Sequence, residues 1–219
     1  MYCADKRIDV ISMSLGGYLN LTDPNDRAIY LALLKAVLYA RARGCVLVAA
    51  AGNEALDLTE TLLNYSVVLV PAMLPGVIAV SSITDIYELA PYSNYGFGVI
   101  DVAAPGGYWY GYPEEGWWYH LCLNCWSPES VVLPGYYYAW MSGTSAACPH
   151  VSGTAALILS INPKLRPFMV EYIIKATATD LGEPGYDKYF GYGLVDAYGA
   201  AKLAEKTSKF MWLRLHVKK

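Results

Sequence analysis

One segment of the sequence places a hydroxyl group where it could act as a nucleophile. Residues 141–150 read M-S-G-T-S-A-A-C-P-H, and Val151, Ala155 and Leu159 then follow at intervals of four, which predicts that Ser145 begins a helix. The first backbone N–H groups of a helix are unpaired and the helix dipole is positive there. Such a serine could attack a carbonyl carbon whose oxygen becomes negative, although a serine that only caps the helix is the commoner alternative for G-T-S alone.

The complete string favours the nucleophile. G-T-S-x-A-x-P-H resembles the active-serine motif of the subtilisin-like serine proteases, the subtilases of peptidase family S8. The resemblance implies that Ser145 is the nucleophile, that Gly143 and Thr144 contact the substrate, and that His150 is a packing residue. Five residues along a helix turn His150 by about 500°, which points it away from Ser145. Ala146 stands where the family often has methionine, a difference that alters packing and not chemistry.

Length and composition limit the class of protein. The chain has 219 residues, of which 55% are hydrophobic and 16% charged, so we expect one globular unit. The resemblance implies that this unit is a single partial subtilase domain over 1–219. A net charge of −3 argues against a nucleic-acid partner. No apolar run is long enough for a transmembrane segment, and charged residues near the start, from Asp5 to Asp9, leave no signal peptide in this chain. An extracellular or cell-surface location is implied only by the resemblance.

Alternating strands and helices are predicted along the chain. Apolar runs rich in β-branched residues predict strands at 8–15, 45–51, 77–83 and 100–106, and Asp23 can cap a helix between the first two. Strand, helix and strand in this order form a right-handed unit with parallel strands. We therefore expect an α/β fold of three layers, a mostly parallel sheet flanked by helices. By resemblance it is subtilisin-like and lacks the N-terminal strands of that fold.

The ends of the first two strands are predicted to lie at one edge of the sheet, where ligands bind in such folds. The residues there are Ser14, Leu15, Gly16 and Gly17 after the first strand and Ala51, Gly52 and Asn53 after the second. By resemblance, S-L-G-G lines the substrate backbone and the first specificity pocket, whose floor lies within 54–70. A-A-A-G-N-E resembles the segment that carries the oxyanion-hole asparagine. Gly-Asn after a strand is often only a turn, but in this context we interpret Asn53 as a donor to the negative oxygen.

Residues 107–140 differ from the rest of the chain in composition. They contain seven tyrosines and five tryptophans and form a longer segment than we expect between the two flanking subtilase motifs, so we interpret them as an insertion. Its rings either form a binding face or pack on each other and on the core, and we favour packing. Cys122, Cys125 and His120 suggest a metal site, but three ligands without a fourth are weak support, and a disulfide in a loop or two free thiols is the better interpretation of C-x-x-C. A basic tail at 202–219 is expected to be a solvated helix end.

A serine of this kind needs a histidine base and an orienting carboxylate. In the subtilisin arrangement both precede the oxyanion asparagine, and this sequence begins at the strand that would follow them. Asp101 lies where the family has a structural residue, and only His120 could be considered as a base. We expect the triad Asp and His to come from an N-terminal segment. Without that segment, the strand at 8–15 would expose an apolar edge, and the isolated chain would be poorly soluble.

Three functions remain open from the sequence. The first is a serine endopeptidase that acts on peptides or proteins through an acyl-enzyme on Ser145, present here as its C-terminal part. The second is a non-catalytic pseudo-peptidase that binds through the cleft and the aromatic insertion. The third is a metal-binding accessory domain. The chemistry of the first needs no cofactor, and the resemblance allows a structural calcium ion without assigning residues to it.

Overall fold

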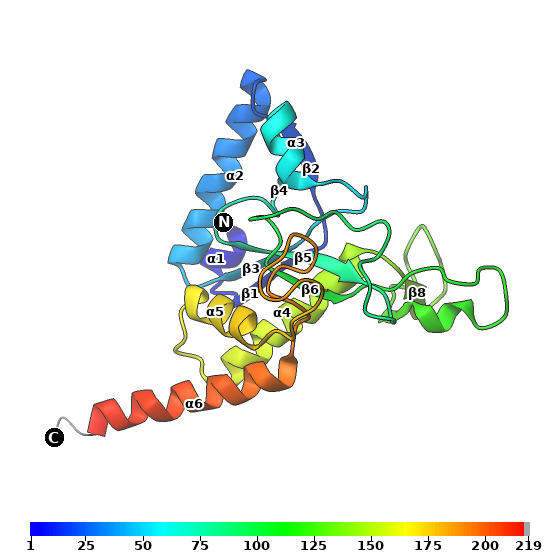
Figure 1. Ribbon diagram of the computed structural model, residues 1–219. Coiled ribbons are helices and arrows are strands. Elements are labelled where there is room, and N and C mark those ends of the chain that lie inside the picture. Colours follow the sequence, from blue (N-terminus) through cyan, green and yellow to red (C-terminus); the bar gives the residue numbers. More distant parts are fainter. Residues whose placement is uncertain (217–219) are drawn as a thin grey trace.

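A parallel sheet of four strands forms the centre of the computed structural model, which describes the backbone of residues 1–216 and the side chains through Thr207 (Figure 1). The strands are β1 (Val10–Met13), β3 (Val46–Ala50), β5 (Val77–Ile83) and β6 (Val102–Pro105), in the order β1-β3-β5-β6. Each adjacent pair is parallel. The predicted parallel sheet is therefore confirmed, with strands shorter than the predicted runs.

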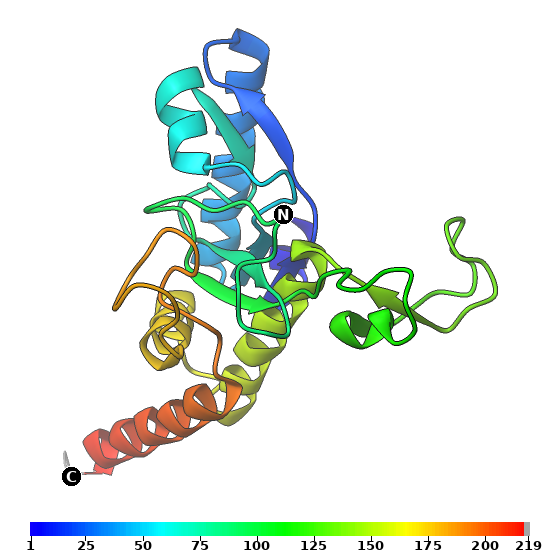
Figure 2. The same ribbon diagram turned by 45° about the vertical axis from the view of Figure 1, so that its right-hand side comes forward.

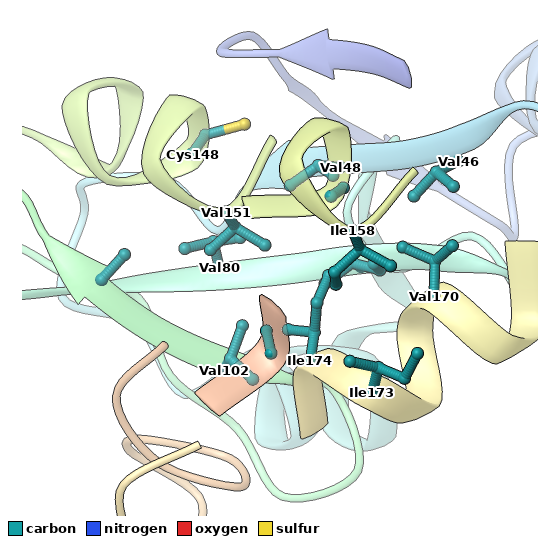
Figure 3. Packing of buried hydrophobic residues seen from close by; sticks show 14 of the residues in the cluster. Val46, Val48, Val80, Val102, Cys148, Val151, Ile158, Val170, Ile173 and Ile174 are labelled. Atoms are coloured by element: carbon teal, nitrogen blue, oxygen red, sulfur yellow. The ribbon is translucent and has the colours of Figure 1, made fainter. Parts of the chain in front are cut away.

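Helices cover both faces of this sheet. One face packs against α4 (Thr144–Ile161), α5 (Pro167–Thr177) and α6 (Ala197–His216), and the other against α2 (Pro24–Ala42). Alternate residues of β3 explain the two layers, because Val46 and Val48 contribute to one core and Leu47 and Ala49 to the other. Figure 3 shows the first core, where Val151 and Ile158 of α4 meet Val48 and Val80 of the sheet. The predicted three-layer α/β fold is confirmed.

Smaller elements complete the fold. A short helix, α1 (Tyr2–Asp5), precedes β1, and β2 (Gly17–Asn20) pairs antiparallel with β4 (Val67–Val70) beside α3 (Leu58–Tyr65). The start of α2 follows the predicted capping, since the Asp23 side chain accepts hydrogen bonds from the N–H groups of Asn25 and Asp26.

Strand β1 lies at an edge of the sheet and pairs only with β3 within the described part of the chain. Beside it lies an apolar cavity of about 460 Å³, bounded by residues of α1, β1, β4 and α2 that include Met13, Leu33 and Val70. Leu15, two residues after the end of β1, is 64% exposed. The expected open apolar edge is therefore present, and the expected poor solubility stays a prediction.

The aromatic segment 107–140 projects from the body of the molecule (Figure 2). It contains a short helical turn, η1 (Trp117–His120), and a hairpin of β7 (Cys122–Cys125) and β8 (Tyr138–Met141). Some of its rings contact each other, as predicted: Trp109 stacks on Trp117 with centroids 5.0 Å apart, and Tyr112 meets Trp117 edge-on. Many others are exposed, so packing explains only part of this segment. Its status as an insertion stays a prediction.

The C-x-x-C pair does not form half of a metal site. Cys122 and Cys125 are free thiols on one strand, three residues apart, so their side chains point to opposite faces of the hairpin. His120 bonds Asp85 through Nδ1 at 2.6 Å. Among the side chains that the structure describes, through Thr207, no three potential metal ligands cluster together. The two thiols thus match the interpretation as free cysteines and do not support a metal-binding accessory domain.

Asp101 has the structural role expected of it. Its carboxylate accepts the N–H of Ala79 on β5 at 2.7 Å and pairs with Lys175 on α5 at 2.6 Å. Burial lowers the pKa of Lys175, but Asp101 and Glu171 outweigh burial and raise it to about 12. The lysine is therefore a fixed cation that joins a helix to the sheet. The helix α6 contains most of the basic tail, but the side chains after Thr207 lie outside the described part of the chain.

Candidate active site

Ser145 is the second residue of α4 and is half-buried. Pro149 of the motif lies inside this helix. Because proline has no N–H, it cannot donate to the carbonyl four residues earlier, which is that of Ser145. Ser14 Oγ donates to this carbonyl instead, at 2.8 Å, and Ser145 Oγ lies 3.5 Å from the Ser14 carbonyl oxygen. The proline of the motif thus leaves an acceptor through which the end of β1 is attached to the start of α4.

Asn53 is anchored by its carbonyl end. Its Oδ1 accepts hydrogen bonds from Thr144 N at 2.8 Å and from Thr144 Oγ1 at 3.0 Å. The same hydroxyl accepts the N–H of Gly52 at 3.1 Å, so buried Thr144 joins the end of β3 to the start of α4. No acceptor in the described chain takes the Asn53 side-chain N–H₂ or the backbone N–H of Ser145. Two donors next to the Ser145 hydroxyl are therefore free to bind a negative oxygen.

Asn94 fixes the loop that carries Asn53. Its side chain is fully buried; Oδ1 accepts from Glu54 N at 3.1 Å and from Leu56 N at 2.9 Å, and Nδ2 lies 2.8 Å from the Ala51 carbonyl oxygen. Gly52 adopts φ +93°, and a Cβ there would overlap the Asn94 amide. The turn therefore requires glycine for both conformation and space.

The carboxylate of Glu54 accepts three hydrogen bonds at this loop. Glu54 Oε2 accepts from Tyr18 OH at 2.5 Å, from Asn94 Nδ2 at 2.7 Å and from the Asn53 N–H at 3.0 Å. Burial alone would raise the pKa of Glu54, but these hydrogen bonds outweigh it and lower the pKa. The glutamate is therefore ionised at neutral pH, and burial together with Glu54 raises the pKa of the Tyr18 phenol well above its usual range.

A cavity of about 170 Å³ opens beside Ser145. It is lined by the predicted residues Leu15, Gly16, Gly52, Asn53, Thr144 and Ser145, together with Tyr18, Ala50, Glu54 and Leu69. Glu54 and Leu69 come from the 54–70 stretch in which we placed the pocket floor. The structure thus brings most of the predicted residues of three separate segments to one small polar pocket.

Besides Ser14, three predicted site residues lie close by but do not line this pocket. Gly17 begins β2, and Ala51 is buried with its carbonyl oxygen bonded to Asn94. Gly143 has φ +138°, and its N–H is held by the carbonyl of Gly106 at 3.0 Å and by Tyr92 OH at 2.8 Å. These three residues therefore shape the backbone around the pocket.

Four residues of this region were not assigned to the site from the sequence, namely Tyr18, Glu54, Tyr92 and Asn94. Half-buried Tyr92 supports the turn at Gly143, shortly before Ser145, because its hydroxyl contacts Ser82 Oγ at 2.8 Å and Gly107 O at 2.7 Å as well as the Gly143 N–H. Burial raises its pKa to about 12. Of these four, only Glu54 could have been assigned to the site from the sequence, because it directly follows the Gly52-Asn53 pair. The others act through contacts between distant segments.

No histidine in the described part of the chain bonds Ser145. His120 is paired with Asp85, and His150 Nδ1 is bonded to the carbonyl oxygen of Ala146 at 2.9 Å. The packing role expected for His150 is wrong, because the residue is exposed and bonded to its own helix. His216 lies beyond the described side chains. Within the described residues, the Ser145 hydroxyl and the two free N–H donors beside it therefore have no histidine bonded to them.

Comparison with known proteins connects this geometry to one family. Residues 1–193 match the model of the subtilase family, Peptidase_S8. The chain is 35% identical to subtilisin DY of Bacillus licheniformis over 195 residues, which are 89% of this chain and 57% of that protein. It is 36% identical to an extracellular protease of Xanthomonas campestris over 198 residues, 90% of this chain and 29% of that protein. The chain thus spans less than two thirds of these relatives.

The fold also matches solved structures. A lanthipeptide protease superposes with a TM-score of 0.81 and 31% identity, covering 92% of this chain and 63% of that one. The match extends over nearly all of the layers described above, from the parallel sheet to the helices on both faces.

Proposed function

Because this chain belongs to the subtilase family of serine peptidases, we propose that it is the part of a serine endopeptidase that carries the nucleophile. Its reaction is the hydrolysis of peptide bonds in peptides or proteins. Ser145 Oγ attacks the carbonyl carbon, the amine leaves, and water then hydrolyses the acyl-enzyme. An extracellular location is part of this proposal, supported by the extracellular protease among its relatives. No helix in residues 1–216 has the length and hydrophobicity of a membrane span.

The observation that carries the proposal is the anchored amide of Asn53. Thr144 binds the Oδ1 end, which leaves the N–H₂ end as a donor together with the Ser145 N–H. Such donors stabilise the negative oxygen of a tetrahedral intermediate more than the neutral carbonyl of the substrate. A serine that only capped its helix would need no preorganised amide beside it.

We further propose that the base and its orienting carboxylate come from an N-terminal segment that supplies a histidine and an aspartate. The open edge of β1 supports this, because its unpaired backbone and the adjacent apolar cavity of about 460 Å³ offer a surface for another strand or helix. The absence of a histidine bonded to Ser145 among the described residues is consistent with it. A structural calcium ion stays a prediction without assigned ligands.

A non-catalytic binding module is the second candidate. The only hydrogen bond of the Ser145 hydroxyl in the described chain is to the Ser14 carbonyl, at 3.5 Å, and no group there would accept its proton. Such a protein would keep the pocket and bind peptides without cleaving them.

A serine-directed phosphonylating probe distinguishes the two functions. Applied to the protein expressed from its complete reading frame, it should label Ser145, and Ser145→Ala should abolish the labelling. Ser160→Ala is a matched control, because Ser160 lies exposed on the same helix and is bonded only to the carbonyl of Leu157. Labelling that persists in Ser145→Ala would exclude this serine as the nucleophile. A folded protein that is never labelled would support the binding module.

A further inference from the structure

The aromatic arm, defined as residues 107–140, is attached directly to the residues that precede Ser145. It leaves the core after Gly106, whose carbonyl accepts the N–H of Gly143, and β8 returns it to Ser142. The indole Nε1 of Trp109 donates to the Ser142 hydroxyl. In both ribbon views the arm and β2 extend in different directions from the start of α4 (Figures 1 and 2). The arm thus forms a second surface beside Ser145, separate from the small pocket.

The hairpin of this arm has one exposed face. The pairing of β7 with β8 sets Leu123 opposite Trp140 and Cys125 opposite Tyr138, and these four residues share a face because side chains alternate along a strand. All four are exposed, Tyr138 to 65% and Trp140 to 41%. The two rings stand on the strand that leads to Ser142, at about 13 Å and 7 Å from it for a rise of about 3.3 Å per residue. A polypeptide held at Ser145 could therefore reach both rings.

The charges of the arm select the kind of polypeptide. The arm contains no lysine or arginine, whereas Glu114, Glu115 and Glu129 are all exposed. No ion pair or hydrogen bond engages their carboxylates within the part of the chain that the structure describes. Electron-rich ring faces and free carboxylates both attract cations. Neighbouring Tyr and Trp would also suit a membrane interface, but an anionic leaflet would repel these carboxylates.

We propose that the aromatic arm is a docking surface for an extended, cationic segment of the polypeptide substrate, with Arg or Lys at alternate positions. Residues two apart in an extended peptide lie on one face at about 7 Å, which matches the spacing of Tyr138 and Trp140. This inference rests on the proposed peptidase function, which identifies the substrate as a polypeptide. It adds the chemical class of the segment and the surface that binds it.

The test is a binding measurement that requires no turnover. The protein, expressed from its complete reading frame and carrying Ser145→Ala, is titrated into a fluorescein-labelled peptide with arginine at three alternate positions, and anisotropy is recorded. The same peptide with glutamate in place of arginine is the comparison. The arginine peptide should bind at least about tenfold more tightly, with an affinity that falls as salt is added.

Variants locate the binding surface. Tyr138→Thr with Trp140→Thr keeps residues that favour strands and should weaken binding about four- to twenty-five-fold, since each cation–π contact contributes about two- to fivefold. Changing the three arm glutamates to glutamine should reduce the preference for the arginine peptide. Tyr65→Ala and Glu60→Gln on α3 are matched controls that remove an exposed ring and an exposed carboxylate elsewhere, and they should leave binding unchanged.

The outcomes separate this proposal from that of the peptidase. Unchanged peptide affinity in the arm variants, or equal binding of both peptides, would overturn the docking proposal while leaving the labelling of Ser145 unaffected. Arm-dependent binding of phosphatidylcholine vesicles instead of the arginine peptide would also overturn it, and would identify a membrane contact. Arm-dependent binding of the arginine peptide by a protein that the phosphonylating probe never labels would retain the docking surface and refute only the peptidase.

Discussion

Replacing Asn94 by alanine tests whether the Asn94 side chain supports the Gly52-Asn53 turn. Asn94 is fully buried, and its amide supports the Gly52-Asn53 turn through the N–H groups of Glu54 and Leu56 and the carbonyl of Ala51. Alanine removes all of these contacts and leaves an empty space behind the turn. We expect Asn94→Ala to destabilise the protein and to loosen the turn that positions Asn53.

The magnitude follows from which groups lose their partners. Glu54 and Leu56 are exposed, so water can partly replace the lost hydrogen bonds to their N–H groups, at about 0.5–1.5 kcal/mol each. The Ala51 carbonyl is buried and would be left unsatisfied, at about 1–3 kcal/mol. The free energy of unfolding should therefore fall by at least about 2 kcal/mol, which corresponds to a decrease in Tm of about 4–8 °C or more for a chain of this size.

Urea unfolding followed by tryptophan fluorescence measures this change, with the protein expressed from its complete reading frame. Asn64→Ala is the matched control, because Asn64 is exposed on α3 and makes no side-chain hydrogen bond in the described chain; it should change stability by less than about 0.5 kcal/mol. Two results would refute the view that buried Asn94 supports the turn. One is a loss of unfolding free energy below about 0.5 kcal/mol in Asn94→Ala, and the other is an unchanged kcat for peptide hydrolysis in this variant.

Three further predictions concern other contacts of the site and the core. Below pH 10 the raised pKa of Lys175, about 12 against a usual value of about 10.5, means that its pair with Asp101 stabilises the fold, and this stabilisation is lost as the pH rises to 12. The difference in unfolding free energy between wild type and Lys175→Met should therefore shrink by about 1.5 kcal/mol between pH 10 and pH 12 in urea titrations; a constant difference would contradict it. Two peptide substrates that place either Lys or Met in the cavity beside Ser145 test Glu54. Glu54→Gln should lower the ratio of kcat/KM for the Lys substrate to that for the Met substrate by about fivefold, a loss of about 1 kcal/mol. An unchanged ratio would show that the Glu54 charge does not act on the side chain in this cavity. Ser14→Ala should cost about 0.5–1 kcal/mol in unfolding free energy, because water can replace its bond to the Ser145 carbonyl; a cost above about 2 kcal/mol would mean that Ser14 has a further structural role.

The sequence by itself determined the features that depend on local patterns. Buried strands follow from runs such as 45–51, and the start of α2 from Asp23 followed by proline. The position of Ser145 near the start of α4 follows from the apolar spacing that comes after it. These features are readable because hydrogen bonding within a helix and side-chain alternation in a strand involve residues close together in the chain.

Only the tertiary structure decided what surrounds the serine. Asn94 contacts a loop 40 residues earlier, and Tyr92 holds a turn 51 residues later. Neither contact leaves a periodic signal, because it depends on the paths of separate loops and on which polar groups burial leaves without water. The exposed faces of His150 and of the β7–β8 hairpin were equally undetermined, since exposure depends on which elements pack nearby. The motif therefore fixed the position of Ser145 near the start of α4, and tertiary packing decided which groups surround it and which surfaces stay exposed.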